Sequence, residues 1–486
     1  MYQISKYAIF LSIVPCAIGP ALAAPGSAAG SSAAPSAAAN APVAAPNGAT
    51  GNAPAANAAP AANAAPAANG APAAAPSAES VIDFVAQPLT ESDAVRLGLA
   101  HNPQISGGLA GVASAESTYK STAAFPPINL GVTTVTGSSA APTLNGETSD
   151  TFVDLGGTID TSGQRRAQAA SQKATFRATR YQFEETKLTL TQQIRDAYWS
   201  LVAARAQTQM NLDSLHDVQH VNDLTKQQLD AGAAPRGDVL RSSIDLANAL
   251  QAYITAQGAE RSALLALNTV LGRPAATPLQ LADALTEDNL GKLPVATLPP
   301  LPELTSDALA NRPAVKAASE QVSSATFSVK QSRAARMPDI SIDYERSVRD
   351  DVDAWVVAAH VPLLDFGSIS QSIKAAQQTR IQTESQQLQA QQQVVQQVAQ
   401  AHQDYTQAQL LASSYLDDIL KPSVTLLDMS QLGYKQGATG ILPVIDAEST
   451  LRSARIGYIN DLLALYKARD EVEAAVGRPI GAPGAP

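Results

Sequence analysis

The sequence contains one cysteine and five histidines in 486 residues. One thiol excludes an intrachain disulfide and a cysteine-based zinc site. Two of the histidines, His216 and His220, are spaced by one helical turn, close to Asp213 and Asp217. Such spacing can hold a metal, but two histidines leave its coordination shell incomplete. We interpret them as polar positions on a solvated helix face, and we predict no metal site and no cofactor.

Positive charge and catalytic motifs are also scarce. The 33 lysines and arginines are outnumbered by 43 aspartates and glutamates, for a net charge of −10. Nucleic-acid binding needs clustered basic residues, so we expect no nucleic-acid partner. The sequence has no glycine-rich phosphate loop, no H-E-x-x-H and no G-x-S-x-G string. We therefore predict that the protein is not an enzyme.

Long apolar runs are absent beyond the N-terminus. The apolar run 7–18 follows Lys6 and precedes an Ala-Leu-Ala cleavage sequence at 21–23. This arrangement predicts a secretory signal peptide over 1–23. No later run reaches the roughly 18 apolar residues of a membrane-spanning helix, so any membrane crossing is expected to use β-strands.

Charged residues are missing altogether from 24–78. Within this segment proline recurs every six residues, at Pro54, Pro60, Pro66 and Pro72. Proline at this spacing breaks an alanine-rich helix, and the segment has no large hydrophobic side chains to bury. We predict a disordered linker rich in alanine, proline and asparagine.

What the sequence does contain is a duplication. The first repeat covers 79–274 and the second 305–479, with an inter-repeat segment at 275–304 and a tail at 480–486. At a constant offset, identical or similar residues recur: Gly232 with Gly437, Val239 with Val444, Leu246 with Leu451 and Tyr253 with Tyr458. Internal similarity of this length indicates two copies of one structural plan.

Each repeat predicts short helices, then two strands, then a long helical hairpin. The β-hairpins are expected at 128–160 and 340–364, where apolar and polar residues alternate. The helical hairpins are expected at 163–274 and 367–477, and Pro422 should kink the second. The fold class is thus mainly α with four strands per chain. Four strands cannot close a barrel, although strands from several chains together could.

Taken together, these features resemble the TolC-like outer-membrane efflux protein family, over 79–479. The residues that carry the resemblance are the paired helix starts 99–103 and 309–313, the strand starts at Pro126 and Pro338, the stretch 361–367, and the second tip from Tyr434 through Gly437 to Ala447. The resemblance implies a homotrimer. Its strands would form a twelve-stranded transmembrane β-barrel in outer-membrane lipid, and its long hairpins an α-helical barrel in the periplasm. Segment 275–304 and the tail would form an equatorial collar.

The resemblance also implies a function: a passive outer-membrane exit duct of a tripartite efflux or secretion system. Its partners would be a periplasmic adaptor protein and an inner-membrane pump. The residues expected to dock on the adaptor lie at the two tips: Gly232, Ala233, Ala234, Gly437, Ala438 and Thr439. A periplasmic gate is expected from Asp446, Arg241 and Asp238, with an Arg241–Asp446 ion pair as a hypothesis. The alternative function is the periplasmic adaptor itself, which also carries a long helical hairpin.

Overall fold

The computed structural model describes most of the two predicted repeats. The described residues are 88–138, 147–232, 234–285, 298–348, 352–360 and 366–479. They belong to one compact unit of the chain. The predicted signal peptide 1–23, the predicted linker 24–78 and the tail 480–486 lie outside them.

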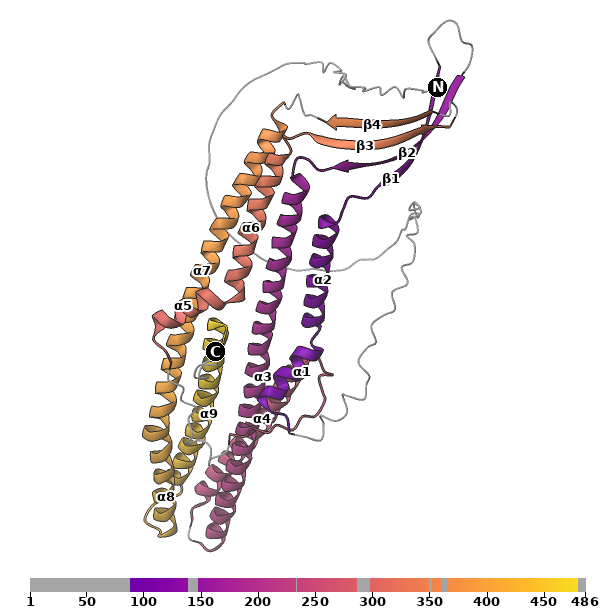
Figure 1. Ribbon diagram of the computed structural model, residues 1–486. Helices are drawn as coiled ribbons and strands as arrows, with labels where there is room; N and C mark the ends of the chain where they lie inside the picture. Colours follow the sequence, from indigo (N-terminus) through magenta and orange to yellow (C-terminus); the bar gives the residue numbers. More distant parts are fainter. Residues whose placement is uncertain are drawn as a thin grey trace, which may run out of the picture. The chain divides into compact units, whose positions relative to one another are not determined.

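The described elements form two series in the same order, as Figure 1 shows. The first series is α1 (Glu91–His101), α2 (Pro103–Ala123), β1 (Asn129–Ser138), β2 (Glu147–Ile159), α3 (Gln164–Asp230) and α4 (Arg236–Val270). The second is α5 (Leu301–Asn311), α6 (Pro313–Ala334), β3 (Asp339–Ser347), β4 (Val352–His360), α7 (Ser368–Tyr415), the π-helical turn η3 (Leu416–Leu420), α8 (Lys421–Lys435) and α9 (Leu442–Val476). The predicted mainly helical class with four strands is confirmed. Helix α5 begins inside the predicted inter-repeat segment, because Pro300 and Pro302 start its first turn.

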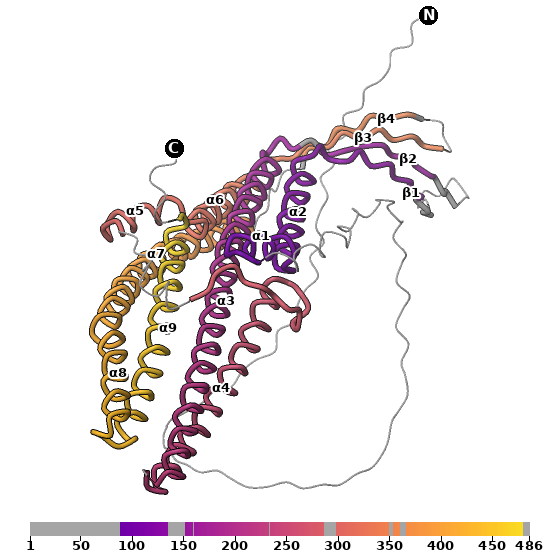
Figure 2. Tube along the Cα trace, turned by 90° about the horizontal axis from the view of Figure 1, so that it is seen from below, coloured from indigo at the N-terminus to yellow at the C-terminus, as the bar shows by residue number. Residues whose placement is uncertain are grey.

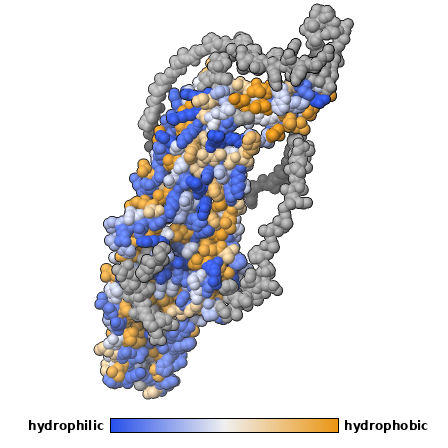
Figure 3. All heavy atoms as spheres, viewed as in Figure 1, coloured by the Kyte–Doolittle hydropathy of each residue, from blue (hydrophilic) through white to orange (hydrophobic). Residues whose placement is uncertain are grey.

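The four strands form one antiparallel sheet in the order β1-β2-β3-β4. The two repeats join at its centre, where Leu155 pairs with Tyr344. Large apolar side chains on the sheet are exposed: Leu130, Val132, Trp355 and Val357 are each more than 60% accessible. In Figure 3 apolar residues gather over these strands. The sheet therefore has an uncovered apolar surface.

The long helices extend away from the sheet toward two tips at the opposite end of the unit (Figure 2). Helix α3 has 67 residues. Its apolar positions recur at helical spacing and are matched in the second repeat by equally buried residues 204 positions later. The matched pairs are Leu190 with Val394, Ile194 with Val398, and Leu201 with Tyr405, all at most 3% exposed. The two repeats therefore bury equivalent faces of their long helices.

A π-helical turn accommodates the difference in length between α3 and the continuous helix α7–η3–α8 of the second repeat. The matching offset is 204 residues at the buried positions but 205 at the tips, as in Gly232 and Gly437. The extra residue falls within α7, η3 and α8, which have 48, 5 and 15 residues, one more in total than α3. A π-helical turn takes up an added residue locally, and here it precedes Pro422, which cannot donate a hydrogen bond. The structure thus has a change of helix type just before Pro422, where the sequence predicts a kink.

The two repeats also conserve the joint between their short and long helices. After α4, Gly272 has φ +72°, and after α9, Gly477 has φ +79°, so both adopt the left-handed conformation of a helix C-terminus. The side chain of Asn102 donates to the carbonyl of Val270 at 2.7 Å. Arg312, its counterpart, donates to the carbonyl of Ala475, the residue matching Val270. The equivalent backbone carbonyl thus accepts a hydrogen bond in both repeats, from an amide side chain in the first and from a guanidinium group in the second.

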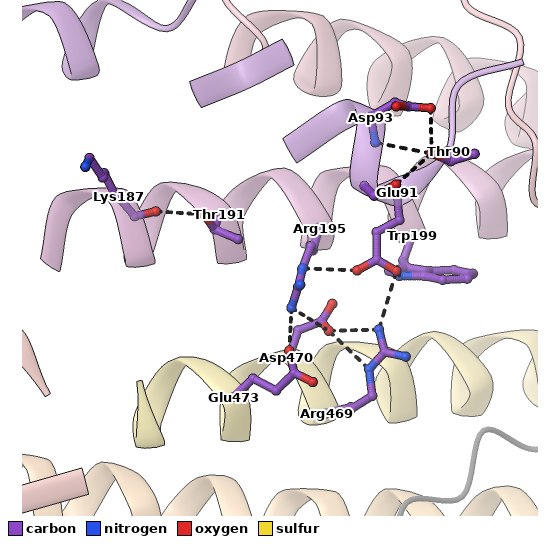
Figure 4. Close-up of polar contacts among 11 residues, drawn as sticks. Thr90, Glu91, Asp93, Lys187, Thr191, Arg195, Trp199, Arg469, Asp470 and Glu473 are labelled. Atoms are coloured by element: carbon purple, nitrogen blue, oxygen red, sulfur yellow. Dashed lines mark hydrogen bonds and ion pairs between the residues drawn. The ribbon is translucent and has the colours of Figure 1, made fainter. Parts of the chain in front are cut away.

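An ion cluster ties the first repeat to the second (Figure 4). Arg195 of α3 contacts Glu91 of α1 at 3.0 Å and Glu473 of α9 at 2.6 Å. Arg469 contacts Asp470 at 2.9 Å. The side chain of Asp470 is fully buried, and this burial raises its pKa to about 6 against the opposing effect of Arg469. The cluster lies between three helices, so it fixes their relative position.

Candidate periplasmic tip

The candidate site consists of the two turns at the far end of the long helices. The first tip, residues 231–235, joins α3 to α4, and the second tip, residues 436–441, joins α8 to α9. Their backbone hydrogen bonds match: Gly232 donates to Leu229, and Gly437 donates to Tyr434. Both glycines have positive φ, at +72° and +71°. The same C-capping turn therefore ends both outgoing helices.

The residues expected to dock lie on the surface of these turns. Gly232, Gly437, Ala438 and Thr439 are exposed and Ala234 is half-buried, while Ala233 lies outside the described residues. Thr439 folds back against α8, since a Cβ on Gly433 would lie 3.0 Å from its Oγ1. The second tip is thus a tight turn with an accessible backbone.

The expected gate residues are placed on α4 and α9. Arg241 lies 3.9 Å from Asp238, three residues earlier on the same helix. Asp446 is exposed on the second turn of α9. Among the described residues of this single chain no ion pair joins Arg241 to Asp446. The structure thus pairs Arg241 within its own helix, at the spacing that brings side chains together on one face.

A contact between the tips was not anticipated from the sequence. The hydroxyl of Tyr434, at the end of α8, donates to the side-chain oxygen of Gln228, at the end of α3. Tyr434 belongs to the tip motif, but its partner lies 206 residues away. No sequence pattern marks Gln228 as its acceptor. This hydrogen bond connects the two helical hairpins next to their turns.

The remaining predictions for the site concern metals and membrane helices. Within the described residues no cluster of three or more metal-binding side chains is present, and His216 and His220 are exposed on α3. In the same part of the chain no helix is both long enough and apolar enough to cross a membrane.

Comparison with known proteins places these features in a family. The model of the family described as outer membrane efflux protein matches residues 94–273 and 304–478, which are the two repeats. The chain is 22% identical to the cobalt-zinc-cadmium resistance protein CzcC of Cupriavidus metallidurans, over 66% of this chain and 75% of that protein. It is 28% identical to the toluene efflux pump outer membrane protein TtgI of Pseudomonas putida, over 51% of this chain and 53% of that one.

A solved structure shares the fold. The MtrE outer membrane channel of Neisseria gonorrhoeae, in its open state, matches with a TM-score of 0.67 at 19% identity, covering 80% of this chain and 89% of that one. The family match spans most of both repeats, so it does not depend on any one motif. The chain with its two repeats, four-stranded sheet and paired tips belongs to the outer membrane efflux protein family.

Proposed function

We propose that three copies of this chain assemble into a passive exit duct that docks on a periplasmic adaptor and an inner-membrane pump. The chain is an efflux channel protein of the outer membrane by family, which confirms the expected location and the expectation that it is not an enzyme. The comparisons give no support to the alternative function of an adaptor. The trimer, the partners and the gate are proposals that rest on the geometry of the sheet and helices.

The observation that carries the trimer is the four-stranded sheet. In the described chain, β1 and β4 are its edges, and each pairs on one side only. An unpaired edge in lipid leaves backbone donors and acceptors without partners, at a cost of several kcal/mol per group. Three sheets joined edge to edge would satisfy them in a closed twelve-stranded barrel. The exposed apolar side chains of the sheet, such as Trp355, would then face lipid.

The long helices also present surfaces that need partners. On α7, Ile381, Leu388 and Val395 are exposed at intervals of seven residues. On α4, Leu240, Ile244 and Ile254 are exposed as well. Apolar residues at heptad spacing are typical of helices that pack side by side along their length. Neighbouring copies of the chain would cover these stripes and close a helical barrel.

In this assembly the two tips of each chain would surround the periplasmic entrance. Three Asp446 carboxylates near the axis would repel one another and attract cations, so they would act as a gate and an ion filter. An Arg241–Asp446 contact would then join neighbouring chains, with Asp238 holding Arg241 in place. The exposed turns at Gly232 and Gly437 offer backbone for an adaptor to dock on. Transport energy would come from the pump, because the duct has no fuel of its own.

The decisive experiment is single-channel conductance of the purified protein in planar lipid bilayers. The wild-type trimer should give a small, cation-selective conductance, and Asp446→Asn should change both its size and its selectivity. Asp428→Asn removes an exposed carboxylate from neighbouring α8 and is the matched control. An inserted trimer whose conductance is unaffected by Asp446→Asn would refute the gate. Protein that never inserts into lipid would refute the duct.

A further inference from the structure

A buried carboxylate lies between the two helical hairpins, close to the tips. Glu448 is on the second turn of α9, two residues after Asp446, and is only 7% exposed. At a rise of 1.5 Å per residue it lies about 9 Å from the start of the helix. Among the described residues, its carboxylate makes no hydrogen bond and no ion pair. A carboxylate buried without such partners is costly when it is charged.

The charges around Glu448 make its ionised form less favourable still. Asp217 of α3 and Asp245 of α4 both repel it, and Arg452, one turn further along α9, attracts it. Arg452 is also within reach of Ser214 on α3, at 3.4 Å. From α8, the apolar Leu427 lines the same pocket as Glu448. Negative charge thus faces Glu448 from the first hairpin, and the attracting charge of Arg452 comes from its own helix. Arg455, which lines the same pocket, is also on α9.

Water can reach this carboxyl group. A cavity of about 20 Å³ is lined by Ser214 and Asp217 of α3 and by Glu448, Arg452 and Arg455 of α9. This volume suffices for one water molecule with polar partners. A proton can therefore enter and leave without the helices first unfolding.

We propose that Glu448 is a proton-controlled latch between the two hairpins: they stay packed while its carboxyl is protonated and separate at the tips when it ionises. Separation would expose the carboxylate to bulk solvent and move it away from Asp217 and Asp245. The latch rests on the proposed exit duct, since separated hairpins would widen its entrance. It differs from the Asp446 gate, which acts between chains on the axis.

The direction of the pH effect follows from burial. Burial, with Asp217 and Asp245, raises the pKa of Glu448 in the packed state to about 7 from its ordinary value of 4.5. Once separated, the carboxyl returns to its ordinary value, so opening releases a proton. The opening equilibrium constant should rise by up to about tenfold per pH unit between about 4.5 and 7, then level off. Acid closes the tips and neutral pH opens them.

The test measures the distance between spin labels on the two hairpins. Exposed Gln219 of α3 and Thr425 of α8 are replaced by cysteine. The one natural cysteine, Cys16, lies within the predicted signal peptide. Trimers with one labelled chain are compared between pH 5 and 8.5, with Glu448→Gln as the test variant and Asp428→Asn as the control. In the labelled parent protein the two labels should move apart as the pH rises. In the Glu448→Gln variant they should stay close at every pH. The Asp428→Asn variant should respond to pH as the parent does.

Other outcomes separate the latch from the duct. An identical pH response with and without Glu448→Gln, or no response in the parent, would overturn the latch. Should Glu448→Gln fail to assemble, Asp217→Asn tests the latch instead. Removing the repulsion between Asp217 and Glu448 must move the response of the labels to lower pH. An unmoved response in Asp217→Asn would overturn it. Conductance is recorded in parallel: hairpins that separate with pH in a protein that never conducts would support the latch and refute the duct.

Discussion

The joint after α4 predicts an unequal cost for one substitution made at three glycines that share the left-handed conformation. Gly272, Gly437 and Gly477 have almost the same backbone, with φ of +72°, +71° and +79°. Alanine in this left-handed conformation costs about 1–2 kcal/mol. Alanine also reduces the freedom of the unfolded chain, a gain of about 0.4–1 kcal/mol that is common to all three sites. The backbone term alone therefore predicts equal effects.

The space around each glycine is what differs. A Cβ on Gly272 would lie 2.7 Å from the carbonyl oxygen of His101, which is backbone and cannot swing away. At Gly477 the nearest atom is the Cα of Arg312 at 3.6 Å, and at Gly437 nothing lies within 4 Å. Overpacking of this kind costs about 1–3 kcal/mol. Gly272→Ala should thus destabilise the protein by about 1–3 kcal/mol more than Gly437→Ala or Gly477→Ala.

The assay is guanidinium unfolding of the detergent-solubilised protein, followed by tryptophan fluorescence. Trp199 reports on this region, because it stacks on Tyr466 with ring centroids 3.7 Å apart in the core that also contains Leu271. The unfolding midpoint should fall furthest for Gly272→Ala. Equal midpoints for Gly272→Ala and Gly477→Ala would refute the reasoning, since they would show that the α1–α2 junction does not resist the added methyl group.

Two further predictions follow from hydrogen bonds and buried charge. Tyr434→Phe removes the hydrogen bond between the tips, about 0.5–1.5 kcal/mol per chain, and should raise bilayer conductance. Tyr253→Phe is the control, because the Tyr253 hydroxyl accepts a hydrogen bond from Gln257 within one helix. An equal rise in conductance in both variants would contradict a role for the hydrogen bond between the tips. Asp196 has a buried Oδ1 without a hydrogen-bond partner among the described residues, and burial raises its pKa to about 6. Because the folded chain binds this proton more tightly than the unfolded chain, the fold loses stability as the pH rises from about 4 to about 6, and the loss is complete above about pH 6. Asp196→Asn should therefore stabilise by roughly 1–3 kcal/mol at pH 7.5 and have little effect near pH 4, measured by guanidinium unfolding; a gain that persists at pH 4 would contradict this.

The elements of the fold were predictable because each depends on residues close together in the chain. The absence of proline and internal glycine between 164 and 230 predicts one long helix, and the alternation around Ile340 and Ile342 predicts a strand. Contacts between the repeats were not predictable in this way. Arg195 contacts Glu473 across 278 residues, and this contact depends on how α3 and α9 pack against each other.

The candidate site shows the same limit. The tips were located from Gly232 and Gly437, because a left-handed cap is a local requirement. Alignment of the two repeats makes Arg241 and Asp446 equivalent positions. Equivalence in sequence does not show which side chains are in contact. The role of Glu448 is not predictable from the sequence for a related reason: its environment depends on Asp217 and Asp245, which come from two other helices.

The π-helical turn η3 compensates for the one extra residue in the long helix of the second repeat. One residue added to an α-helix turns every later side chain by about 100° and moves it by about 1.5 Å. Without compensation, the core residue Leu420 and all positions toward the second tip would face the wrong neighbours. Because η3 confines this rotation to Leu416–Leu420, the tip reached by the longer arm still forms the same capping turn as the tip of the shorter one. Two copies that have diverged in length can thereby keep equivalent ends.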